Sequence, residues 1–398
     1  MRHPLALALA ALPLLTAAQP APDSPLLDSL LHAIPLFRDT LALDRDAYEI
    51  QVLYRPLAGP DSGTTHTWGL APDRYFYPAS TVKLPVAALA LERIAREGIV
   101  GLTSASAMEV GAGPAPQTAS RERVGMPGTP STVAGHVADI GIVSSNEAYN
   151  RLYEWLGPEY INRELHGRGL RSRIVHRLGE PAFGPAENTV LNPVAFRSAD
   201  ADRGDTVLFR GLAYAKTSYT LSLSGERKGR GRYDGERDEV FDGPFDFSAK
   251  NYLALADLAA ILQAIVAPAT VDSALRFRML DTDRELLLAA LSTRPADSDN
   301  PLHHEYPDGY VNFLYYGGDG DWEPDGPLIY NKVGDAYGTL TDAAVFADPA
   351  SGRPLFLVAA TIHVNANGVY NDGVYEYEEL GLPFFRALGR GAWRMVWE

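Results

Sequence analysis

Ser80 and Lys83 are three residues apart and are the pair in this sequence best suited to acyl transfer. On a helix, positions i and i+3 share a face, so the lysine amine can reach the serine hydroxyl. Burial and a nearby cation would lower the pKa of that amine, and the neutral amine could then accept the serine proton. Arginine, which supplies most of the positive charge, cannot act as such a base. The chain has only five lysines: Lys83, Lys216, Lys228, Lys250 and Lys332.

The elements that would position this pair follow from hydrophobic periodicity. An apolar stripe of Leu84, Ala87, Ala88, Leu91 and Ile94 predicts an amphipathic helix over 84–96. Ser80 would then lie at its N-terminus, where backbone N–H groups favour a developing negative charge. Further helices are predicted at 26–42, at 133–157 with a break near 144–146, at 248–266 with Ser248 as its cap, and near 376–389.

Strands are predicted mainly at the two ends of the chain, over 48–56, 327–332, 341–348 and 354–363. Residues 102–131 should be irregular, and 226–239 reads as a solvated insertion within a loop-rich region. This order suggests an antiparallel sheet built from both chain ends, flanked by helices, with a helical lobe inserted between them.

Two further short motifs follow the serine–lysine pair. They are Ser144-Ser145-Asn146 and Lys332-Val333-Gly334, the latter preceded by an apolar run at 327–330 and followed by a predicted strand at 342–346. In order, separation and context, the three motifs resemble those of the class A β-lactamase and penicillin-binding serine hydrolase family. The resemblance covers most of the chain and implies a β-lactamase-like fold, α/β plus all-α, with the site between the lobes.

The resemblance also implies roles for individual residues. Ser80 resembles the acylated nucleophile and Lys83 its base, whereas Ser144 resembles the proton shuttle to the leaving nitrogen. Asn146 resembles the side chain that orients Lys83 and the substrate amide, and Lys332 the cation that holds Ser144 and a substrate carboxylate. Gly334 and Asp335 would bind substrate, with the backbone N–H groups of Ser80 and Asp335 forming the oxyanion hole.

Three positions depart from the class A pattern. Ser145 stands where that pattern has Asp, and Val333 replaces Thr, which removes a hydroxyl that would bind a substrate carboxylate. The glutamate that activates the hydrolytic water is shifted as well. Glu187, before Leu191-Asn192, is the favoured candidate, but it lies one residue too early, and Glu180-Pro181 is the alternative.

Several other motifs are set aside. Ser298-Asp299-Asn300 lies between two prolines and reads as a loop, and Lys216-Thr217-Ser218 precedes the helix at 248–266, where the third motif of the family does not occur. His303-His304 reads as a surface dipeptide rather than a metal pair. We therefore expect no metal and no cofactor.

The N-terminus resembles a secretory leader. A basic start, an apolar run over 4–15 and small residues near Ala18 predict a signal peptide over 1–18, then a linker over 19–25. One hydrolase domain should span 26–398, with an α/β lobe at about 26–79 and 285–398 and a helical lobe at about 80–284. We expect a protein exported to the periplasm or the medium, with no membrane span.

Composition limits the partners. The net charge of −15 argues against nucleic acid and anionic membranes, and the absence of cysteine excludes disulfides and thiol catalysis. We expect a monomer that acts on a small β-lactam or a cell-wall peptide. Three functions remain open: a β-lactamase, a D-Ala peptidase or esterase of the same family, and a catalytically weak penicillin-binding or sensing module.

Overall fold

The computed structural model describes residues 22–179, 183–198, 206–217, 219–318, 320 and 322–397. The predicted leader, residues 1–18, lies outside these ranges, so export stays a prediction. Residues 19–21 of the predicted linker lie outside these ranges as well, and its last residue, Pro25, already begins the first helix, α1. No helix within the described ranges has the length and apolarity needed to cross a bilayer.

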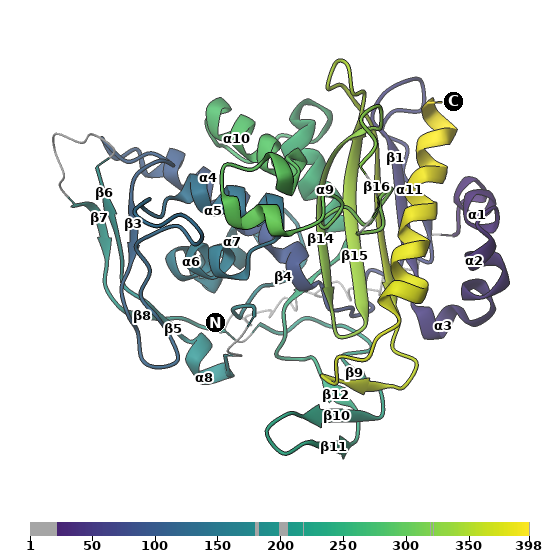
Figure 1. Ribbon diagram of the computed structural model, residues 1–398, viewed down its shortest axis with the longest axis horizontal. Coiled ribbons are helices and arrows are strands. Elements are labelled where there is room, and N and C mark those ends of the chain that lie inside the picture. The colour runs from purple at the N-terminus through teal and green to yellow at the C-terminus, as the bar shows by residue number, and fades with distance from the viewer. Residues whose placement is uncertain are drawn as a thin grey trace, which may run out of the picture.

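A five-stranded antiparallel sheet forms the centre of the molecule (Figure 1). Its strand order is β14-β15-β16-β1-β2, with bounds Leu328–Ala336, Thr339–Ala347, Pro354–His363, Gln51–Pro56 and His66–Trp68. Gln51 at the start of β1 pairs with Thr361 near the end of β16. Both chain ends therefore build one sheet, which confirms the predicted fold class.

Helices cover both faces of this sheet, and the alternation of side chains along each strand explains why. In β16, Leu357 and Ala359 pack into the core shared with α9 (Leu255–Val266). Their neighbours Phe356 and Val358 point to the opposite core, which is shared with α11 (Leu382–Trp397). Every residue of β15 is buried, so the central strands lie between two apolar layers.

The helical part of the chain is built around α4 (Lys83–Glu97), which is buried over most of its length. Around it lie α5 (Val133–Val143), α6 (Asn146–Leu156), α7 (Pro158–Gly167) and α10 (Asp281–Ser292). The predicted break near 144–146 is confirmed. Ser144 ends α5 with a left-handed φ of 55°. Ser145 caps α6, because its hydroxyl accepts a hydrogen bond from Ala148 N in the first turn at 3.2 Å.

Two helix predictions need correction. The helix expected over 26–42 is divided by Pro35 into α1 (Pro25–His32), α2 (Pro35–Asp39) and the 3₁₀ turn η1 (Leu41–Asp44), followed by α3 (Arg45–Tyr48). The helix expected over 248–266 begins only at Leu255. Ser248 is not its cap, because Tyr252–Leu253 forms β13, which pairs with β4 (Ser172–Arg173).

The predicted loop over 226–239 is also more ordered than expected. It contains β9 (Arg227–Lys228) and a hairpin of β10 (Gly231–Asp234) and β11 (Glu239–Asp242), which projects at the bottom of Figure 1. β10 pairs in parallel with β17 (Val369–Tyr370), and β9 pairs with β12 (Phe245–Asp246). These backbone pairings fix the segment, because its polar side chains alone would not.

The remaining elements are short. A small sheet joins β3 (Met108–Val110), β6 (Val194–Arg197) and β7 (Thr206–Arg210), and β5 (Val190–Leu191) pairs with β8 (Ala213–Tyr214). The other turns are α8 (Pro185–Asn188), η2 (Ala79–Val82), η3 (Pro268–Thr270), η4 (Pro295–Asp297), η5 (Pro301–Glu305) and the π-helical turn η6 (Tyr377–Gly381).

Candidate active site

Ser80 lies in the 3₁₀ turn η2, directly before α4. Ala79 precedes it with a φ of 45°, an uncommon conformation for a residue with a side chain. Such strain persists where the surroundings hold it in place, and it is frequent at functional sites. Lys83 begins α4, is fully buried, and donates from Nζ to Ser80 Oγ at 2.8 Å. The predicted contact between the two side chains is therefore present.

Ser144 connects this pair to a second lysine. Lys83 Nζ donates to the carbonyl oxygen of Ser144 and lies 3.2 Å from its Oγ. From β14, Lys332 Nζ donates to the same Oγ at 2.8 Å and to the carbonyl of Val333 at 2.9 Å. The structure thus joins Lys332, Ser144, Lys83 and Ser80 in one chain of hydrogen bonds, in which the two lysines, from β14 and α4, are the donors.

Burial sets the protonation of the two lysines. Removal from water lowers the pKa of Lys83 well below its usual range, and the charge of Lys332 lowers it further, although Asp335 opposes this. Burial also lowers the pKa of Lys332, to about 7, against the opposing carboxylates of Asp342 and Asp335. A neutral Lys83 beside a protonated Lys332 is the arrangement that a serine nucleophile requires.

Asp342 supports this site from behind and was not identified from the sequence. It is fully buried on β15, opposite Val333, and accepts from Leu314 N at 2.9 Å and Asn331 Nδ2 at 3.0 Å. Burial raises its pKa to about 7. An aspartate directly before the apolar run 343–347 of a predicted strand was the available signal, because an aspartate is rarely fully buried unless it is paired.

Gly334 allows β14 to pass very close to the nucleophile. A Cβ at this position would lie 2.6 Å from the carbonyl oxygen of Pro78 and 2.8 Å from Ser80 N, both impossible contacts. Only glycine therefore fits here. The close approach brings the next residue, Asp335, to the wall of the cavity that contains Ser80.

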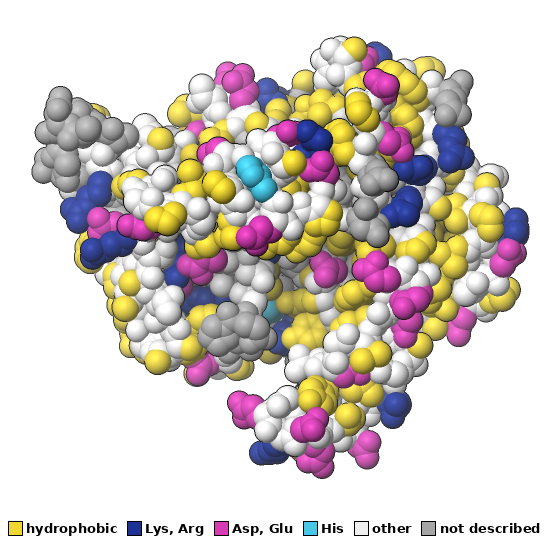
Figure 2. All heavy atoms as spheres, viewed as in Figure 1, with side chains coloured by type: hydrophobic (Ala, Val, Ile, Leu, Met, Phe, Trp, Pro, Cys, Tyr) yellow, Lys and Arg dark blue, Asp and Glu magenta, His cyan; other side chains and the backbone are white. Residues whose placement is uncertain are grey.

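That cavity has a volume of about 440 Å³. It lies between the helical part of the molecule and the edge of the sheet at β14. Figure 2 shows the surface of the molecule over these two parts. The side chains that line it come from both, and they are Ser80, Ser144, Asn146, Pro307, Tyr310, Phe313, Gly318, Val333, Asp335, Leu340, Tyr377, Glu378 and Leu382. Tyr310, Tyr377 and Glu378 were not predicted, because nothing in their local sequence indicates that they meet Ser80.

Asn146 begins α6 and lines the same cavity. Its side chain packs against Gly179, where an added Cβ would lie 2.8 Å from Asn146 Nδ2. Among the described hydrogen bonds none joins Asn146 to Lys83. The orienting role that the resemblance implies for Asn146 therefore stays a prediction.

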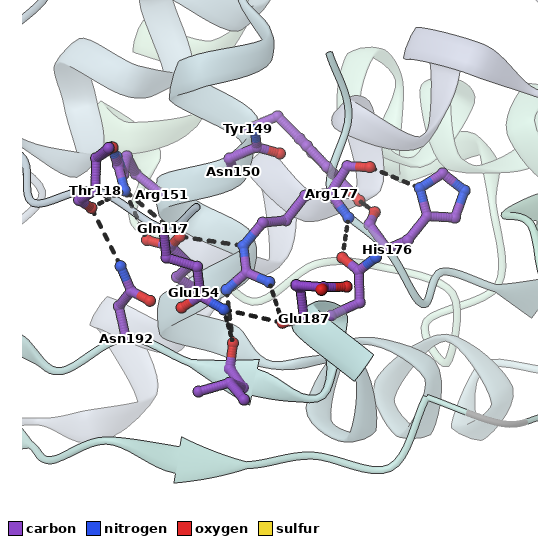
Figure 3. Close-up of polar contacts among 12 residues, drawn as sticks. Gln117, Thr118, Tyr149, Asn150, Arg151, Glu154, His176, Arg177, Glu187 and Asn192 are labelled. Carbon is purple, nitrogen blue, oxygen red and sulfur yellow. Dashed lines mark hydrogen bonds and ion pairs between the residues drawn. The ribbon is translucent and has the colours of Figure 1, made fainter. Parts of the chain in front are cut away.

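Glu187 does not lie at the cavity that contains Ser80. It is in α8, and its backbone carbonyl accepts from Gln117 Nε2 at 2.9 Å and from Arg177 Nη1 at 3.3 Å (Figure 3). It is absent from the described cavity lining. The alternative candidate, Glu180, falls outside the described residues.

A buried ionic network holds the segment that leads to residue 179. Glu154 on α6 accepts from Arg177 Nε at 3.1 Å and from Arg151 Nη1 at 3.1 Å, and all three side chains are almost fully buried (Figure 3). Arg177 also donates from Nη2 to the carbonyl of Val190 at 2.8 Å. This network anchors the segment after β4 to the helix that carries Asn146.

The motifs set aside from the sequence have structural roles. Asp299 pairs with Arg123 at 3.1 Å, and Ser298 Oγ lies 2.8 Å from His303 Nδ1, so this segment braces α5 through Asp139. His303 is buried rather than on the surface, which corrects its assignment as a surface residue. Within the described residues no group of three or more His, Cys, Asp or Glu is placed to hold a metal.

Comparison with protein families identifies the family of this chain. The profile of the β-lactamase enzyme family matches residues 39–374. The chain belongs to this family. It is therefore a hydrolase of the β-lactamase-like serine type, which acts on a small-molecule substrate. A search of curated proteins finds no match.

A search of solved structures finds β-lactamases among its matches. The chain is 15% identical to a β-lactamase from Burkholderia vietnamiensis, with a TM-score of 0.49 over 93% of this chain and 97% of that one. A β-lactamase from Desulfarculus baarsii is 18% identical, with a TM-score of 0.48 over 93% of this chain and 98% of that one. An ancestral class A β-lactamase is also 18% identical, with a TM-score of 0.47 over 90% of this chain and 98% of that one.

Proposed function

We propose that this protein is a serine acyl hydrolase that opens β-lactam amide bonds through an acyl-enzyme on Ser80. The observation that carries the proposal is the hydrogen bond of 2.8 Å from a fully buried Lys83 to the Ser80 hydroxyl. A lysine whose pKa is lowered in this way can take the serine proton at neutral pH.

In the proposed first step Ser80 Oγ attacks the amide carbonyl carbon while its proton passes to Lys83 Nζ. The backbone N–H groups of Ser80 and Asp335 hold the resulting oxyanion. Ser144, held by Lys332, then gives its hydroxyl proton to the leaving nitrogen and is reprotonated from Lys83 as the C–N bond breaks. The product is an ester of Ser80, and attack by water on that ester releases the acid and restores the serine.

Ester or D-Ala peptide hydrolysis is the second candidate, and one observation favours it. Val333 lines the cavity where a hydroxyl would assist in binding the carboxylate of a β-lactam. Loss of one such hydrogen bond would weaken binding of that carboxylate by on the order of 1 kcal/mol. The chemistry at Ser80 would be unchanged, with an ester or peptide carbonyl in place of the lactam.

The test is intact-protein mass spectrometry after incubation with a fluorescent penicillin and with a chromogenic ester, comparing wild type with Ser80→Ala. We expect consumption of at least one substrate, or a stoichiometric adduct, in wild type alone. Rapid loss of penicillin without an adduct identifies a β-lactamase, whereas a lasting adduct identifies a penicillin-binding enzyme. Consumption that survives Ser80→Ala would contradict the proposal.

The same measurement addresses the water-activating glutamate. Because Glu187 does not line the cavity, Glu187→Gln should not accumulate the acyl-enzyme. Glu180→Gln tests the remaining candidate, and accumulation of adduct in that variant would assign the role to Glu180. Accumulation in Glu187→Gln instead would show that this residue acts on the water after all.

A further inference from the structure

The cavity at Ser80 has an unusual balance of charge for a site that would receive an anionic substrate. Asp335 on β14 and Glu378 on η6 both line it, whereas none of its described lining residues is Lys, Arg or His. Figure 2 shows Asp and Glu side chains gathered along the middle of this face, over the region that β14, β15 and the start of α11 occupy in Figure 1.

Lys332 offsets the charge of Asp335 only in part, and it does not line the cavity. It is 1% exposed, and its ammonium already donates to Ser144 Oγ and to the carbonyl of Val333. Val333, which lines the cavity, has no hydroxyl to offer. A further anionic group of the substrate beside Asp335 and Glu378 would therefore meet two negative side chains and no cation in the described lining, at an electrostatic cost.

Neither acidic side chain is neutralised by an ion pair. Within the described part of the chain, Asp335 and Glu378 have no Lys, Arg or His nitrogen within 4.0 Å, and both are exposed. They come from separate elements, a sheet edge and a π-helical turn, and converge on one cavity. Their two charges thus remain available to a ligand.

The rest of the lining suits an organic cation. Tyr310 and Tyr377 add two aromatic rings to the wall, and aromatic rings attract cations, alkylammonium groups in particular. Phe313, Leu340 and Leu382 supply apolar surface on which methyl or methylene groups can pack. Carboxylates, aromatic rings and apolar side chains together form a wall that recognises an ammonium group attached to carbon.

We propose that the acyl substrates of this enzyme carry a cationic ammonium group, which Asp335 and Glu378 select. This inference rests on the proposed acyl transfer at Ser80 and narrows its substrate class. Asp335 follows Gly334, which contacts the nucleophile, so the ammonium group would lie near the scissile carbonyl. Asp335 and Glu378 are then specificity-determining residues, separate from the residues that transfer protons.

Three arylboronic acids on one scaffold test this, because boron forms a reversible bond with a reactive serine and needs no turnover. They differ only in the para substituent, which is trimethylammoniomethyl, its neutral isostere neopentyl, or carboxymethyl. Affinity is measured by isothermal titration calorimetry, and the tetrahedral adduct is followed by ¹¹B NMR with Ser80→Ala as the blank. We expect wild type to bind the cation about tenfold more tightly than the isostere, and the carboxylate most weakly.

The variants Asp335→Asn, Glu378→Gln and the double variant should reduce that preference, the last to about twofold. Glu379→Gln is the matched control, because Glu379 lies beside Glu378 on the same turn but outside the cavity lining. The ratio of two affinities within one variant cancels any general loss of reactivity. Glu378 is exposed, so its replacement should not impair folding.

The outcomes are distinct. If the neutral boronate forms a Ser80 adduct but the cation binds no better, or if the preference survives the double variant, the charge inference is overturned and acyl transfer at Ser80 stands. If no boronate forms an adduct with wild type, the proposed function fails and the inference with it. A preference lost in the double variant and kept in Glu379→Gln establishes the assignment.

Discussion

Lys332 and Asp342 make the activity sensitive to pH near neutrality. Lys332, with a pKa of about 7, loses the positive charge that it presents to Ser144 as the pH rises, so acyl transfer should decline above about pH 7. Asp342 raises the pKa of Lys332, and Asp342→Asn should therefore move this decline to lower pH. The measurement is kcat/KM for a chromogenic substrate between pH 5 and 9, limits chosen to span the ordinary range of titration about that value.

Asp348→Asn is the control for this experiment. Asp348 is a partly exposed residue just beyond the end of the same strand, β15, and accepts from its own turn, for example from Ala350 N at 2.8 Å. Its replacement should leave the alkaline limb in place. An alkaline limb that is identical in wild type and Asp342→Asn would show that Lys332 does not govern the decline.

Gly334 offers a steric test of the same site. In Gly334→Ala the new methyl group would overlap Pro78 O and Ser80 N, so β14 must move away from the nucleophile. A displacement of this order should slow acylation of Ser80 about 100-fold, with a loss of about 1–3 kcal/mol in the free energy of unfolding. The acylation rate follows from time-resolved mass spectrometry, and stability from urea denaturation.

Gly167→Ala at the end of α7 provides the comparison, since nothing lies within 4 Å of an added Cβ there. This variant should acylate at the wild-type rate. Equal acylation rates in the two variants would mean that the close approach of β14 to η2 is not required.

Among single residues, Ser80, Lys83, Ser144 and Lys332 could be predicted from the sequence to lie together, and the structure shows the hydrogen bonds between them. Serine and lysine at i and i+3 share one face of a helical turn and can therefore meet, and the other two motifs have a recognisable order. Asp342 could be noticed as an acidic residue in a mostly apolar strand, but its proximity to the site depends on strand register, and that of Glu378 depends on a π-helical turn. Neither register nor such a turn follows from local residue preferences.

Among the elements, α6 is held by a buried ionic network in which Glu154 pairs with both Arg151 and Arg177. Glu154→Ala would leave Arg151 and Arg177 buried without their shared carboxylate. We expect the free energy of unfolding to fall by about 3–5 kcal/mol, because an unpaired buried charge is costly. Chemical denaturation followed by circular dichroism measures this loss.

Glu97→Gln is the corresponding change in a partly exposed pair, with Arg93 at 3.1 Å. It should cost about 0.5 kcal/mol or less. If the two variants were equally stable, the network around Glu154 would not be what anchors the segment before residue 179.

Element boundaries show where local reasoning ends. The break between α5 and α6 was predictable, because Ser145 is a good cap and the apolar pattern is interrupted there. The late start of α9 was not, because Tyr252–Leu253 leaves the helix to pair with β4, a segment some 80 residues earlier. A serine at 248 satisfies a capping pattern equally well whether or not a distant strand competes for the residues that follow it.

For the whole molecule, the order of predicted elements was enough to indicate one antiparallel sheet made from both ends of the chain. The extent of the inserted segments was not. The hairpin of β10 and β11 lies in a charged, glycine-containing stretch that reads as loop, and it is fixed by parallel pairing with β17 near the other end of the sequence. Long-range backbone pairing of this kind has no local signature.

The pairing of β1 with β16 also has a consequence for how the molecule is made. Gln51 and Thr361 face each other across the sheet although 310 positions separate them (361 − 51). During synthesis the edge of β1 that pairs with β16 stays unpaired until β16 has been made. Closing so long a loop slows folding. The rate at which active protein accumulates should therefore depend on the pairing of β16, the last strand of this sheet to be synthesised. Shortened chains that end before β16 should be degraded by proteases or should aggregate.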